Sequence, residues 1–101
     1  MSRKFNLHIL LYKEDSYQMA HCLEFDIVAQ GNTKKEALQN LIDGIELQVD
    51  FAIENNSLEL LYNPAPPEYW QKLAQTRKYP FTNKVQVPAF ISTLDCNYLV
   101  A

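Results

Sequence analysis

The segment HCLEFDIVAQGNTKKEALQNL, residues 21–41, changes its hydrophobic period at its centre. Before Gly31 the residues alternate as in a strand, whereas after Thr33 the apolar residues recur at the spacing of an amphipathic helix. The chain must therefore pass from strand to helix through one short turn. Gly31 is predicted to supply a permissive backbone angle there. A phosphate-binding loop would need further glycines and a Gly-Lys-Ser/Thr element, which the sequence lacks.

The helix after this turn is predicted to span residues 33–55. Thr33 and Glu36 fit a capping box, and Asn55 with Asn56 forms a stop signal. One face of the helix is apolar: Ala37, Leu38, Leu41, Ile42, Ile45, Val49, Ala52 and Ile53. The opposite face carries four acids, called the acidic stripe below: Asp43, Glu46, Asp50 and Glu54. Leu47 and Phe51 lie beside the apolar face, so we expect something other than the N-terminal strands to cover them.

Three strands are predicted before the helix, over residues 5–12, 17–23 and 25–30. A polar turn at residues 13–16 makes the first two a hairpin. If this turn is centred on Glu14 and Asp15, three pairs face one another: His8 and His21, Leu10 and Met19, and Tyr12 and Tyr17. The result is an antiparallel three-stranded meander.

The tail is interrupted by Pro64, Pro66 and Pro67. Residues 67–75 are predicted to form a short helix with proline in its first turn. A fourth strand is expected within residues 84–88 or at the C-terminus, with 85–87 resembling a strand stub. The predicted class is α+β, in the order β-β-β-α-β, with a short C-terminal helix and an extra strand. Residues 1–58 form the main unit, and residues 59–101 are an extension packed on the same domain.

Composition and cysteine spacing exclude several functional classes. The formal net charge of −3 offers no field that attracts nucleic acid. Cys22 and Cys96 lie far apart without CxxC spacing, which indicates neither a zinc site nor a disulfide framework. No apolar stretch approaches the length of a membrane span, so we expect a cytoplasmic protein without membrane contact.

Few residues suggest catalysis. His8 and His21, as cross-strand neighbours, would form half of a metal site, but Cys22 points to the opposite face. The acidic stripe extends over about three turns, unlike a two-metal site. We therefore expect no catalytic residue, cofactor or metal. A small metal-binding or enzymatic domain that uses the His8/His21 pair is the alternative.

An interaction role is favoured by surfaces that one helix does not cover. The second face of the meander is rich in aromatic and apolar residues, so either the tail or another chain should cover it. The candidate partner or oligomer interface combines this face with the outer side of the helix: His8, Leu10, Tyr12, Tyr17, Met19, His21, Leu23, Asp43, Glu46, Leu47, Asp50, Phe51 and Glu54.

The order of these elements resembles the HicB antitoxin family. Ten residues between positions 5 and 56 match the family pattern: Tyr17, Ala20, Cys22, Glu24, Gly31, Thr33, Glu36, Ala37, Asn40 and Leu41. The resemblance implies a truncated ribonuclease H-like fold that lacks catalytic acids. It also implies oligomerisation, and binding to a small basic toxin, HicA, which cleaves RNA with a histidine. A dimer or tetramer is predicted because Leu47, Phe51 and the open sheet face need cover.

Two departures from the family pattern affect these expectations. Residues 22–26, CLEFD, lack the usual prolines and glycine, so the connection between the second and third strands is expected to differ in shape. Many members also end in a DNA-binding module, but this tail has few basic residues: Lys72, Arg77, Lys78 and Lys84. We therefore predict a HicA-like toxin and self as partners, and no nucleic acid.

Overall fold

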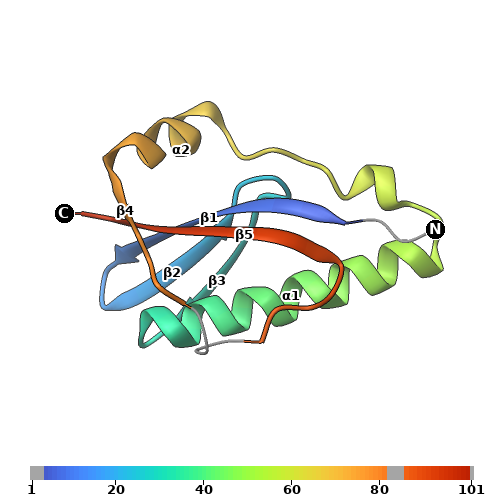
Figure 1. The fold of residues 1–101 in the computed structure, drawn as a ribbon, viewed down its shortest axis with the longest axis horizontal. Helices are drawn as coiled ribbons and strands as arrows, with labels where there is room; N and C mark the ends of the chain where they lie inside the picture. The colour runs from blue at the N-terminus through green and yellow to red at the C-terminus, as the bar shows by residue number, and fades with distance from the viewer. Residues whose placement is uncertain (1–3, 82–85, 101) are drawn as a thin grey trace.

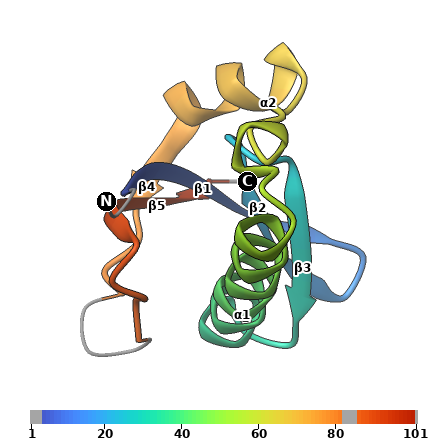
Figure 2. The same cartoon turned by 90° about the vertical axis from the view of Figure 1, so that its right-hand side faces the viewer.

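The computed structural model contains one five-stranded sheet, with helix α1 on one face and helix α2 over the other (Figure 1 and Figure 2). The structure describes residues 4–81 and 86–100. The strands are β1 (Phe5–Glu14), β2 (Tyr17–Cys22), β3 (Ile27–Gly31), β4 (Thr76–Lys78) and β5 (Ile91–Leu99). The helices are α1 (Lys34–Glu54), α2 (Pro67–Lys72) and the 3-10 helices η1 (Leu58–Leu60) and η2 (Leu73–Gln75). The predicted α+β class is confirmed.

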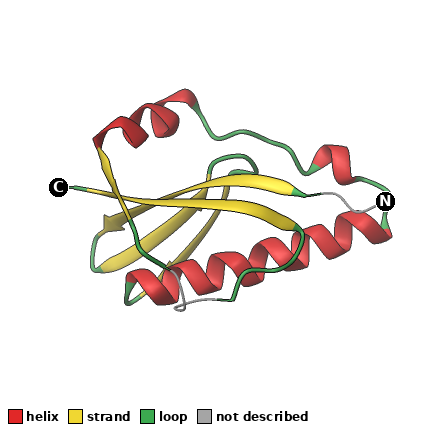
Figure 3. Cartoon of the chain, viewed as in Figure 1, coloured by secondary structure: helices red, strands yellow, loops and turns green. Residues whose placement is uncertain are grey.

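The sheet is larger than the predicted meander. Its order is β3-β2-β1-β5-β4, and β5 runs parallel to β1 while every other neighbouring pair is antiparallel. The strand expected at the C-terminus is therefore present, and it lies next to β1. Residues 86–88 form no strand, Val85 lies outside the described residues, and the three-residue β4 was not expected. Figure 3 shows the resulting sheet between its two helical layers.

The register of the first hairpin corrects the prediction. The turn is formed by Asp15 and Ser16, so His21 lies opposite Leu10 instead of His8. Asp15 takes a φ of 55°, a left-handed conformation that aspartate tolerates better than most residues. The two-residue turn lets β1 continue through Glu14. Because the slip is two residues, each side chain keeps its predicted face.

Helix α1 begins and ends as the sequence predicts. The Glu36 N–H donates to Thr33 Oγ1 at 3.1 Å, and Glu36 Oε1 accepts the Asn32 N–H at 3.0 Å. Gly31 was predicted to supply a permissive backbone angle. This reason is wrong, because no described glycine has a positive φ. A Cβ at Gly31 would lie 2.5 Å from the Ala37 backbone nitrogen. Glycine is needed there for close approach between β3 and α1.

Two separate apolar clusters hold the layers together. The larger one joins α1 to the sheet through residues such as Leu7, Ile9, Leu41 and Ile45. The smaller one lies on the other face and contains Leu10, Leu23 and Ala65, with side chains of α2 packed against them. No described helix is long and apolar enough to cross a membrane.

Candidate functional site

The segment 63–75 covers the sheet face that the sequence left open. Its backbone is tied to the β2–β3 turn, because the Asn63 N–H donates to the Glu24 carbonyl at 3.0 Å and the Ala65 N–H to the Leu23 carbonyl at 2.8 Å. The Trp70 Nε1–H donates to the Ala65 carbonyl at 3.1 Å. We call residues 63–75 the strap. The predicted helix 67–75 corresponds to α2 followed by η2.

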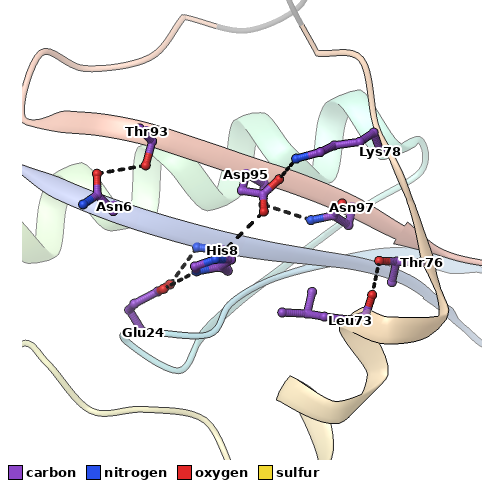
Figure 4. Close-up of polar contacts among 9 residues, drawn as sticks. All are labelled: Asn6, His8, Glu24, Leu73, Thr76, Lys78, Thr93, Asp95 and Asn97. Carbon is purple, nitrogen blue, oxygen red and sulfur yellow. Dashed lines mark hydrogen bonds and ion pairs between the residues drawn. The ribbon is translucent and has the colours of Figure 1, made fainter.

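His8 is held by a buried carboxylate (Figure 4). Glu24 Oε1 accepts the His8 backbone N–H at 2.7 Å, while Glu24 Oε2 lies 2.6 Å from His8 Nδ1. On the other side of the ring, His8 Nε2 lies 3.9 Å from Asp95 Oδ2. The carboxylate thus fixes the orientation of the imidazole, as in histidines that serve as bases or metal ligands.

Asp95 connects this histidine to β4. Lys78 forms a hydrogen bond and ion pair with the Asp95 carboxylate (Figure 4). This hydrogen bond is the largest influence on the Asp95 pKa and lowers it from the usual 3.8, against the opposing effect of burial. The described residues contain no group of three or more His, Cys, Asp or Glu side chains that could hold a metal ion.

His21 lies in a separate, closed environment. It is buried, and its Nε2 lies 2.7 Å from Asp26 Oδ1, while none of the described residues forms a hydrogen bond with its Nδ1. The ring centroid of Tyr69, on α2, is 4.7 Å away. The predicted pairing of His8 with His21 is therefore wrong: they are not cross-strand partners, and each binds its own carboxylate.

Both histidines fasten the strap in the same way. Each lies between a carboxylate of the β2–β3 turn and an aromatic ring of α2, and the second such ring is Trp70, 5.7 Å from His8. The sequence reasoning missed Glu24 and Asp26 as partners. Their signal is the pair of acids three and five residues after His21, followed later by an adjacent Tyr-Trp pair.

The strap closes most of the predicted sheet interface. Leu10 and Leu23 are fully buried, and Tyr12 and Met19 are partly covered. Burial is the main cause that raises the pKa of Tyr12 to about 12. Tyr17, at the hairpin end, stays 44% exposed.

The outer side of α1 is open. All four members of the acidic stripe are exposed, and none of them forms an ion pair with another of the described residues. Leu47 and Phe51 are 71% and 63% exposed, so the cover expected for them does not come from the described chain. Leu60, on η1, is 76% exposed. We call Leu47, Phe51, Leu60 and the acidic stripe the α1-end surface.

The two cysteines lie in the core. Cys22 and Cys96 both neighbour Ile9, one from β2 and the other from β5, which places them two strand spacings apart and beyond disulfide reach. Burial raises the pKa of each thiol to about 12, so neither is a ready nucleophile. No protein-family model, curated protein or solved structure matches the chain in comparisons with known proteins.

Proposed function

We propose that this chain acts by binding another protein, as a HicB-like antitoxin or stand-alone relative that occludes a small basic HicA-type ribonuclease toxin. The observation that carries the proposal is the open α1-end surface, where large exposed apolar side chains and exposed acids share the outer side of α1 and η1. Exposed apolar groups surrounded by polar residues are typical of protein-binding surfaces.

The arrangement of the N-terminal half supports the same proposal. Three antiparallel strands lead through a capped turn into a long helix, and a later strand returns beside β1. This sequence of elements agrees with the β-β-β-α-β unit that the resemblance implies. The strap and β4 lie outside this unit.

The chemistry of the surface fits a basic partner. Exposed carboxylates attract a basic protein over about a Debye length, roughly 8 Å at physiological salt, and so raise the association rate. Apolar side chains buried afterwards keep the complex together. An inhibitor of this kind needs no reaction of its own, because it blocks the ribonuclease by covering its catalytic histidine.

An RNA-cleavage titration tests the proposal. Neighbouring reading frames are searched for a small basic HicA-type protein, the purified chain is added to that protein, and cleavage of a labelled RNA is followed. We expect cleavage to stop at a fixed molar ratio, as for stoichiometric inhibition. Unchanged cleavage at a large molar excess of the chain would contradict the proposal. Self-association as a dimer or tetramer stays a separate prediction, which sedimentation of the chain alone checks.

A further inference from the structure

A shallow apolar groove lies between the last turns of α1 and the 3-10 helix η1. Its lining residues come from both elements and the turn between them: Gln48, Phe51, Ala52, Ser57, Leu60 and Leu61. Its volume is about 240 Å³. Pockets that bury small molecules usually measure about 300–1,000 Å³, so this groove suits one or two protein side chains better.

The walls of the groove carry exposed apolar side chains. Phe51 and Leu60 both line the groove and are largely exposed, and Leu47 lies one turn before Phe51 on α1. Leaving such side chains in water is unfavourable, by about 1.5–3 kcal/mol for each large apolar side chain relative to full burial. A partner that covers all three therefore gains binding energy.

Charge identifies the kind of partner. Residues 36–71 contain seven of the twelve acidic residues and none of the lysines, arginines or histidines. Asp50, Glu54 and Glu59 belong to the elements that form the groove, and α1 has no basic residue in its last turn. The partial negative charge at the C-terminal end of α1 adds to the negative electrostatic potential of these acids.

This field disfavours three other occupants. Nucleic acids and anionic lipid surfaces are repelled. A second copy of the chain, bound through the same surface, would bring together two surfaces that both carry Asp50 and Glu54, and like-charge juxtaposition costs several kcal/mol. A basic protein segment is the occupant with complementary charge.

We propose that the groove between α1 and η1 seats a large apolar side chain of a basic protein segment, whose lysines or arginines lie over Asp50, Glu54 and Glu59. This deepens the proposed function and rests on it where the basic protein is the toxin. The apolar anchor determines the dissociation rate of the complex, and the acids determine its association rate.

Affinity measurements with single variants test the assignment. Binding of the chain to the HicA-type protein is compared for Phe51→Ala, Leu60→Ala and the matched control Val28→Ala, which removes an exposed apolar side chain from β3, away from the groove. We expect Phe51→Ala and Leu60→Ala to weaken binding at least tenfold through faster dissociation. Val28→Ala should change it less than twofold. Circular dichroism establishes that each variant is folded.

The outcomes separate the groove from the proposed function. If the toxin is inhibited equally by wild type, Phe51→Ala and Leu60→Ala, the groove assignment is overturned while the function stands. If wild type does not bind the toxin, the function fails, and the groove is tested with two amphipathic leucine-containing peptides, one rich in lysine and one in glutamate. Binding of the lysine peptide alone, lost in Phe51→Ala, supports the groove. Binding of neither peptide, or dimerisation of the chain that Phe51→Ala abolishes, overturns it.

Discussion

The two helices cover opposite faces of one sheet by different means. Helix α1 has seven buried residues and shares a continuous apolar core with the strands. Helix α2 has none, and it is held by aromatic rings against two carboxylate-bound histidines and by the backbone bonds of the strap. Helix α1 therefore builds the fold, whereas α2 closes a face that would otherwise be open. The outer side of α1 is consequently free for a partner.

The largest effect is expected from a core truncation on the α1 face. Ile45→Ala should lower the free energy of unfolding by about 2–5 kcal/mol, because it leaves a cavity at a fully buried site. Trp70→Ala, on the half-buried strap, should cost less, about 1–3 kcal/mol. Urea unfolding followed by circular dichroism measures both. Equal costs would show that the strap is as much a part of the core as α1.

A pair of glycine substitutions tests how closely α1 packs on β3. Gly31→Ala should destabilise the protein by about 1–3 kcal/mol, since its Cβ would meet the Ala37 backbone. Gly44→Ala is the matched control, because a Cβ there meets nothing within 4 Å and alanine favours the helix by about 1 kcal/mol. Thermal melts should move in opposite directions. A shift of the same sign in both variants would refute the close approach inferred at Gly31.

The elements that could be predicted from the sequence are those with a local signal. The capping box at Thr33 and Glu36 gave α1 its start, and the proline-led segment gave α2. The hairpin register was missed by two residues because a positive φ at Asp15 shortened the turn. The period of β5 was hidden because Ser92 is skipped in its pairing with β1, so Ile91 and Leu94 both face the core.

The histidine contacts beneath the strap were less predictable than the fold, because they form only after the β2–β3 turn and the strap have packed on the sheet. The carboxylates of Glu24 and Asp26 meet the histidines only once the β2–β3 turn has closed, and Trp70 reaches His8 from 62 residues away. Sequence periodicity did identify the acidic stripe and the uncovered position of Phe51, because exposure on a single helix follows from its own spacing.

Charge reversal in the acidic stripe tests whether the open outer side of α1 attracts the partner. With all four acids changed to lysine, we expect the association rate with the basic toxin to fall about tenfold at low salt and to rise with ionic strength, whereas the wild-type rate falls. The dissociation rate should change far less. Stopped-flow measurements at several salt concentrations provide the test, and an unchanged association rate would reduce the stripe to a solvated face.

The smallest effect concerns the ion pair between Lys78 and Asp95 beside the strap. Because the folded-state pKa of Asp95 is lowered from 3.8, the pair stabilises the protein above that pH, and this contribution is lost as the pH falls through the folded-state value. Lys78→Ala should therefore cost about 0.2–1 kcal/mol at neutral pH and nothing in strong acid. Lys13→Ala, at an exposed hairpin position, is the control. A Lys78→Ala cost that persists in strong acid would assign the effect to packing.

Hydrogen exchange of the chain with and without the HicA-type protein reports on the outer side of α1 and on the strap in one experiment. We expect slower exchange on binding in peptides covering residues 43–62, with the strap at residues 63–75 unchanged. Protection confined to the strap, or faster exchange there as α2 leaves the sheet, would contradict the claim that the partner binds the outer side of α1.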